Sequence, residues 1–154
     1  MKNFIFVFDH IAFGIPAACV AEFVQAPVVL DTLIEADSAL GDIFCSIPRF
    51  FRKAAVAAPH GIVLKSLPYP DAVIEALHQY AGGKFRRILL LTTPIEREIE
   101  VPDETILQLP AFLSLPGKLP FLTGVSFSDT VMTAYLDPVL LVSRIIRDAG
   151  VACD

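Results

Sequence analysis

The chain has 154 residues, the usual length of one domain, and its 12 Lys and Arg against 17 Asp and Glu give a net charge of −5. This acidic balance argues against nucleic-acid binding, which needs basic surfaces that displace phosphate counterions. Cys19, Cys45 and Cys153 are odd in number and have no C-x-x-C spacing, so the sequence predicts neither a disulfide framework nor a zinc knuckle.

Apolarity is the unusual property of the composition. Hydrophobic residues make up 55% of the chain and charged residues 19%, whereas typical domains have about 25% charged residues. Mean hydropathy is +0.63. A single small domain cannot bury all of this, so we expect an exposed apolar surface that joins copies of the chain into a homo-oligomer.

The most apolar window, residues 11–34, does not predict a transmembrane segment, because a span needs about 20 nearly uninterrupted apolar residues. Four residues interrupt the window: Pro16, Glu22, Gln25 and Pro27. Near the N-terminus only five apolar residues precede Asp9, which is too short for a signal peptide. We therefore expect a cytoplasmic protein.

The first third of the chain predicts strands that alternate with helices. Residues 4–8 form a short apolar run that is typical of a buried strand. Residues 15–24 predict a helix with Pro16 in its first turn, where a missing N–H has no cost. Residues 28–30 predict a second strand, and apolar residues at helical spacing predict another helix over 32–44 with Asp31 as N-cap.

The remainder continues this alternation. We expect a helix from near Pro48, a strand over 61–67 and a helix over 70–81 that Gly82 and Gly83 end; a central strand around 88–91 follows. Five prolines divide residues 94–120 into short pieces, which form either an interface arm or a cover over a site. After a short strand over 122–127, Asp137 caps a final helix that ends at Gly150.

This order of elements predicts an α/β fold. Strands that alternate with helices indicate three layers, with a mainly parallel sheet flanked by helices in a Rossmann-like arrangement. The short, continuously apolar strands agree with a parallel sheet, because both of its faces are buried. We expect residues 1–154 to form a single domain of this class.

Polar residues at the ends of the predicted strands define a candidate site, because ligands of open parallel sheets bind beyond the carboxyl ends of the strands. Asp9 and His10 are the candidate catalytic pair, since histidine can act as acid, base or metal ligand near neutral pH. The alternative is that the pair only forms hydrogen bonds with its own loop. Asp31, Thr92, Thr93 and Ser128 follow other predicted strands.

The segment after the first strand also has features of a nucleotide-binding loop. A helix N-terminus at this position attracts phosphate, and Asp31 has the position of a ribose-binding acid. Only Gly14 is present where the dinucleotide fingerprint needs three glycines, so that fingerprint is absent. Gly14, Asp31, Thr92, Thr93 and Ser128 are therefore candidate ligand contacts, with the cofactor unidentified.

The sequence FDHIAFGIP, Phe8–Pro16, is similar to the opening strand of the vicinal-oxygen-chelate (glyoxalase-like) family. This resemblance implies that His10 binds a divalent metal. Glu98 or Glu100 would take the place of the family's glutamate ligand, by position alone.

Two functions remain open at this point. The polar strand ends favour a small-molecule-binding domain, with or without catalysis. The high apolarity and the lack of a strong motif favour a non-enzymatic adaptor or assembly subunit, and the glyoxalase-like metal enzyme is a further alternative.

Overall fold

Short strands are the main secondary structure in the part of the chain that the structure describes. The computed structural model describes residues 1–8, 10–25, 30, 32–37, 39–51, 60–108, 121–128 and 131–150, without the side chains of Ser128 and Val131. Within these residues the strands are β1 (Lys2–Phe8), β2 (Ile11–Pro16), β3 (Val20–Gln25), β4 (Ile34–Asp37), β5 (Asp42–Ser46), β6 (His60–Leu64), β7 (Arg87–Thr92), β8 (Ile95–Glu100), β9 (Leu122–Ser128) and β10 (Val131–Leu136). The helices are α1 (Ile47–Phe50), α2 (Asp71–Ala81) and α3 (Pro138–Asp148), with short 3-10 turns η1 (Ala17–Cys19) and η2 (Asp103–Thr105).

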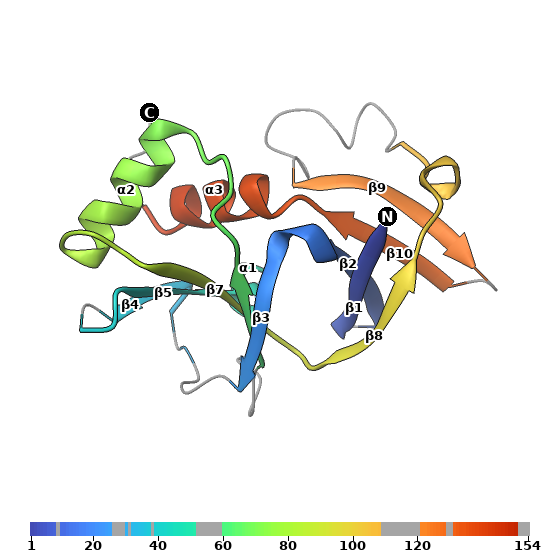
Figure 1. Cartoon of the computed structure of the whole chain (residues 1–154), viewed down its shortest axis with the longest axis horizontal. Coiled ribbons are helices and arrows are strands. Elements are labelled where there is room, and N and C mark those ends of the chain that lie inside the picture. Colours follow the sequence, from blue (N-terminus) through green and yellow to red (C-terminus); the bar gives the residue numbers. More distant parts are fainter. Residues whose placement is uncertain are drawn as a thin grey trace.

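The strands form two mixed sheets of five strands each (Figure 1). Sheet A has the order β8-β1-β2-β10-β9, and sheet B has the order β3-β6-β7-β5-β4. Each sheet contains one parallel pair, β2 with β10 in sheet A and β5 with β7 in sheet B; the other pairs are antiparallel. The prediction of a mainly parallel, Rossmann-like sheet is therefore wrong.

The continuous apolar runs arise because both faces of sheet B are covered. On β5 and β7, Ile43 and Leu90 point into the main core, whereas Phe44 and Leu89 belong to a smaller cluster on the opposite face. The same burial pattern is typical of parallel sheets, and it led to the wrong class of fold.

Two predicted helices are strands in the structure. Residues 15–24 finish β2, pass through η1 and form β3; residues 32–44 include β4 and most of β5. Gly41, at φ +74°, lies between β4 and β5, and its N–H donates to the carbonyl of Asp37 at 2.8 Å. This tight turn lies in the middle of the predicted helix, and Leu40, expected on its apolar face, is exposed.

The two longer helices confirm their predictions. Helix α2 ends at Gly82, whose φ of +73° is the left-handed conformation that favours glycine. Asp137 caps α3, because its carboxylate accepts hydrogen bonds from the backbone N–H groups of Val139 and Leu140. Both helices pack on the same face of sheet B and leave its opposite face without a helix among the described residues (Figure 1). The helix predicted from Pro48 is only the single turn of α1, and residues 52–59 lie outside the described part.

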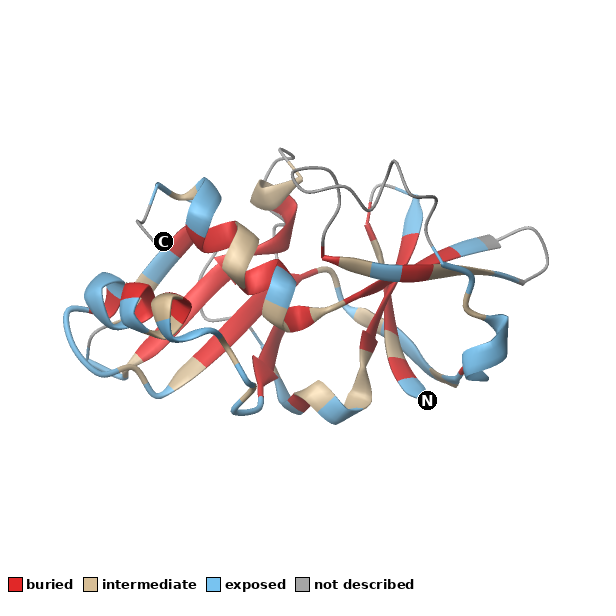
Figure 2. Ribbon diagram, turned by 90° about the horizontal axis from the view of Figure 1, so that it is seen from above, coloured by how far each residue is buried: buried red, intermediate tan, exposed pale blue. Residues whose placement is uncertain are grey.

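One hydrophobic core joins the two sheets (Figure 2). It contains Phe6 and Phe13 from sheet A together with Ile62 and Leu90 from sheet B. The ring of Phe51, just after α1, stacks on Phe13 with centroids 5.3 Å apart. In the described part of the chain, no helix has both the length and the apolar sequence that crossing a bilayer requires.

Candidate interaction surfaces

His10, of the predicted catalytic pair, lies at a hairpin. Phe8 pairs directly with Ile11, so β1 and β2 are antiparallel neighbours with a connection of two residues. His10 is exposed at φ +66°, a conformation that is typical of such short connections. Asp9 and Asp31 lie outside the described residues. The pair therefore does not follow a parallel strand, and its catalytic role stays a prediction.

The other predicted contacts are distributed over both sheets. Thr92 ends β7 fully buried, and the hydroxyl of Thr93 donates to the carbonyl of Val7 at 2.8 Å, which connects sheet B to β1. Gly14 is buried inside β2, opposite Ile5. Ser128 ends β9. Gly14, Thr92 and Thr93 line neither of the two pockets described below, and the ligand-binding role of all four residues stays a prediction.

The glutamates that the glyoxalase-like resemblance suggested form ion pairs on β8. Glu98 pairs with Lys2 at 3.7 Å, and Glu100 pairs with the N-terminal ammonium of Met1 at 3.0 Å. Among the described residues, no group of three or more His, Cys, Asp or Glu side chains is placed to hold a metal ion.

The face of sheet B opposite α2 and α3 contains a groove of about 490 Å³, which we call the sheet B groove. Its floor is apolar and consists of Val24, Phe44 and Leu89 from three different strands. Leu40, at 57% exposure, stands at its rim in the turn between β4 and β5. The carboxylate of Asp37 accepts the N–H of Leu40 at 3.2 Å and so fixes this turn.

A bidentate ion pair forms one wall of the groove. Arg87 donates from Nε and Nη2 to the two carboxylate oxygens of Asp42, each at 2.9 Å. Asp42 is 1% exposed, and the hydrogen bonds from Arg87 lower the pKa of its carboxyl group despite the opposing effect of burial. Glu22 accepts from the same guanidinium at 3.2 Å. Since Glu35 and Asp37 also line the groove, acidic groups outnumber basic ones among its described lining residues.

Sheet A carries a second exposed apolar surface, the sheet A stripe, formed by Ile11, Met132 and Phe127. Met132 pairs directly with Phe127, and the parallel register that joins Thr133 to Ala12 places Met132 beside Ile11. Paired residues share one face of a sheet, so the three side chains form a row across β2, β10 and β9. Their exposures are 39% for Ile11, 41% for Met132 and 62% for Phe127.

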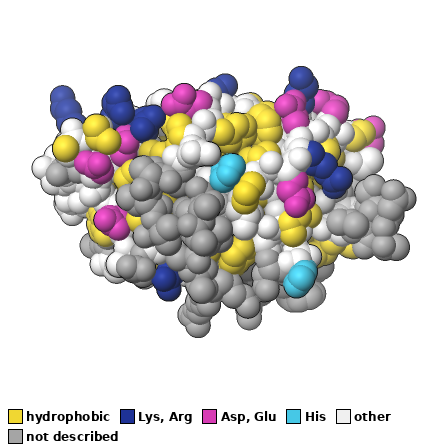
Figure 3. Space-filling view, turned by 90° about the horizontal axis from the view of Figure 1, so that it is seen from below, with side chains coloured by type: hydrophobic (Ala, Val, Ile, Leu, Met, Phe, Trp, Pro, Cys, Tyr) yellow, Lys and Arg dark blue, Asp and Glu magenta, His cyan; other side chains and the backbone are white. Residues whose placement is uncertain are grey.

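Sequence analysis named none of the residues that make up these surfaces as site residues. The only related signal was the predicted strand over 122–127, which contains Phe127, but a strand pattern does not show which strands lie next to each other. Figure 3 shows that hydrophobic side chains reach the molecular surface in several separate places between charged ones. The expectation of exposed apolar surface is thereby met for the residues the structure describes.

Two five-stranded mixed sheets that share one core, with helices on one face of sheet B, define a mainly β class of fold. The scaffolding protein TtCheW from Thermoanaerobacter tengcongensis has a similar structure, with a TM-score of 0.62 and 16% sequence identity. The similarity covers 88% of this chain and 83% of TtCheW. No family model matches the sequence, and no curated protein matches it. The comparison establishes a shared, CheW-like fold.

Proposed function

We propose that this protein is a non-enzymatic adaptor that binds two protein partners at once. The observation that carries the proposal is the presence of two separate candidate surfaces on different sheets: the sheet B groove, where Leu40 is exposed beside a buried apolar floor, and the exposed sheet A stripe. An adaptor needs two such surfaces, whereas a protein with one partner needs one. The likeness to a scaffolding protein supports the same function.

The sheet B groove favours a particular kind of partner. Leu40, 57% exposed at the rim, offers apolar contact above the buried floor of Phe44 and Leu89, so a large apolar side chain would be the anchor of the interface. Acidic residues surround that floor, so basic residues beside the anchor would complement the charge. The sheet A stripe has no charged member and suits a flat apolar surface.

Affinity purification with quantitative mass spectrometry tests the adaptor function. Leu40→Asp places a charge at the rim of the groove, and Phe127→Ser removes the most exposed residue of the stripe. We expect each variant to lose a different set of co-purified proteins at least tenfold and to retain the other set. Leu140→Ser, at a 43% exposed position on α3 outside both surfaces, is the matched control and should lose neither set.

Circular dichroism of all three variants should match the parent protein, because the substituted side chains are exposed. If the Leu40 and Phe127 variants lose the same proteins, the two surfaces are not separate binding sites. If neither loses any, the adaptor function is refuted.

We also propose that copies of the chain associate and that the protein acts in the cytoplasm. Leu107, 53% exposed and outside both surfaces, supports self-association, and native mass spectrometry of the parent and Leu107→Ser proteins tests it. The free thiols of Cys19 and Cys45 support a reducing compartment.

A further inference from the structure

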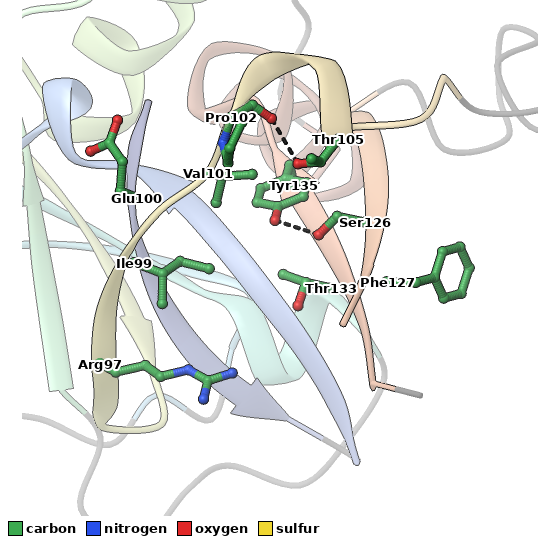
Figure 4. A pocket seen from close by; sticks show the side chains of 10 residues that line it. All are labelled: Arg97, Ile99, Glu100, Val101, Pro102, Thr105, Ser126, Phe127, Thr133 and Tyr135. Atoms are coloured by element: carbon green, nitrogen blue, oxygen red, sulfur yellow. Dashed lines mark hydrogen bonds between the residues drawn. The ribbon is translucent and has the colours of Figure 1, made fainter. Parts of the chain in front are cut away.

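A second pocket, of about 480 Å³, lies on sheet A between β8 on one side and β9 and β10 on the other (Figure 4). Its volume falls within the range of small-molecule sites, roughly 300–1,000 Å³. It contains no residue of the sheet A stripe other than Phe127, whose ring points away from the pocket in Figure 4. The pocket is therefore distinct from both proposed protein-binding surfaces.

Three hydroxyl groups line one wall of this pocket. Ser126 Oγ and Tyr135 OH share a hydrogen bond of 2.6 Å, and Thr133 lies beside them on β10 (Figure 4). Tyr135 and Thr133 are both buried, so their positions are fixed by packing. The hydroxyls can donate or accept hydrogen bonds, which makes this wall suitable for a polar group of a ligand.

Gly14 places the tyrosine ring. A Cβ atom at Gly14 would lie 2.8 Å from Cδ1 of Tyr135 and 3.3 Å from Cδ1 of Ile5, closer than packed atoms allow. Because Gly14 has no side chain, the ring rests directly on β2 and its hydroxyl reaches Ser126. The glycine that sequence analysis named as a ligand contact thus shapes this wall without lining the pocket.

The opposite wall supplies one positive charge. Arg97 extends from β8 into the pocket, and its guanidinium points toward the hydroxyl wall (Figure 4). It forms no ion pair with any residue that the structure describes. Glu100, the acidic residue of the lining, points away in Figure 4 and is bound to the ammonium of Met1. The charge of Arg97 is therefore uncompensated within the pocket.

Apolar groups separate the two walls. Ile99 points into the pocket from β8, and Val101 is buried just beyond the end of that strand. A ligand that reaches both Arg97 and the hydroxyls has to cross this apolar part. The pocket thus combines one cation, the three hydroxyls of the β9 and β10 wall and an apolar middle; a fourth hydroxyl, that of Thr105, donates to the carbonyl of Pro102.

We propose that this pocket binds a small organic acid with one carboxylate group and an apolar body. Arg97 donates to the carboxylate, because a guanidinium matches the geometry of two carboxylate oxygens. Ile99 and Val101 contact the body, and the hydroxyls of Ser126, Thr133 and Tyr135 contact a polar group at its far end or the second carboxylate oxygen. One cation matches one negative charge, which favours a monocarboxylate over a phosphate dianion. This site does not depend on the adaptor function.

Titration of the full chain with phenylacetate, followed by amide NMR, tests the proposal. We expect saturable shifts at Ser126, Thr133 and Tyr135. Arg97→Gln should weaken phenylacetate binding at least tenfold, because it removes charge-assisted hydrogen bonds. Arg147→Gln removes another exposed positive charge, on α3 and outside the pocket, and is the matched control, with unchanged affinity expected. Neutral phenylacetamide should bind at least tenfold more weakly than phenylacetate, and inorganic phosphate should not compete.

A second variant separates binding from folding. Tyr135→Phe keeps the ring over Gly14 and removes only the hydroxyl, so the fold should persist while affinity falls severalfold. The proposal is overturned if no saturable shifts occur at these residues, if Arg97→Gln binds phenylacetate as tightly as the parent protein, or if the amide binds equally well. Competition by phosphate would show a general anion site and would overturn the assignment to organic acids.

Discussion

Removing either partner of the pair between Asp42 and Arg87 should destabilise the fold, but by different amounts. Arg87→Met keeps most of the apolar stem and leaves the Asp42 carboxylate buried without its bidentate partner. Stranding a buried charge in this way costs about 3–5 kcal/mol. Arg86 lies 3.7 Å from the same carboxylate and compensates in part, so we expect a loss of about 3–4 kcal/mol.

Asp42→Ala has a milder effect, because Arg87 keeps access to solvent and to Glu22. The side chain of Arg87 is 28% exposed, and its Nη1 lies 3.2 Å from the Glu22 carboxylate. We expect a loss of about 1.5–2 kcal/mol, the value of charged hydrogen bonds that solvent partly replaces. In the double variant no carboxylate is stranded, so it should be more stable than Arg87→Met alone.

Urea unfolding at pH 7, followed by far-UV circular dichroism, measures these free energies. Tryptophan fluorescence cannot serve, since the chain has no Trp. The reasoning is refuted if Asp42→Ala is as destabilised as Arg87→Met, or if the double variant is less stable than Arg87→Met. Either result would mean that the burial of the carboxylate does not govern the energy of the pair.

Three further outcomes follow from individual side chains. Gly14→Ala should lower the free energy of unfolding by about 1–3 kcal/mol in the same assay, because the alanine Cβ would overlap the buried ring of Tyr135. An unchanged urea midpoint would contradict this packing. The lowered pKa of Asp42 stabilises the fold above the carboxyl pKa of the unfolded chain, about 3.9, and this contribution is lost as pH falls toward the lower folded value. Unfolding free energies measured below pH 4 should therefore fall more steeply with acidification in the parent protein than in Asp42→Ala. Parallel curves for the two proteins would contradict a stabilising role of the Asp42 carboxylate. Burial raises the pKa of the Cys45 thiol to about 12, so iodoacetamide at pH 8 should leave Cys45 unmodified in the native protein. The half-buried Cys19 should react slowly, and peptide mass spectrometry distinguishes the two cysteines. Rapid labelling of Cys45 would be incompatible with its burial.

The longer helices could be predicted because their signals are local. Asp137 lies directly before α3 and Gly82 directly after α2, and each acts on backbone groups a few residues away. The class of fold could not be predicted in the same way. The apolar runs of β1 and β7 indicate that both faces of each strand are buried. They do not indicate whether a helix or a second sheet covers those faces, or in which direction the neighbouring strand runs.

The candidate surfaces depend on register, which is not local either. Asp42 lies opposite Arg87 because β5 and β7 are parallel neighbours. Ile11 lies beside Met132 because β2 and β10 are also parallel neighbours. The predicted site residues are polar residues that follow strands, and such residues mark a site only in an open parallel sheet. In this fold His10 lies in an antiparallel hairpin, so the same rule names residues that the described pockets do not contain.

The parallel pairing of β2 with β10 has a consequence for biosynthesis. Thr133 meets Ala12 across about 120 residues of chain, whereas the strands of sheet B, β3 to β7, are consecutive. On the ribosome, sheet B can therefore form before β10 is made, while the edge of β2 that pairs with β10 still has unpaired backbone N–H and C=O groups. Contacts this distant slow folding and leave the nascent chain prone to aggregation, so this protein should depend on chaperones until β10 has left the exit tunnel.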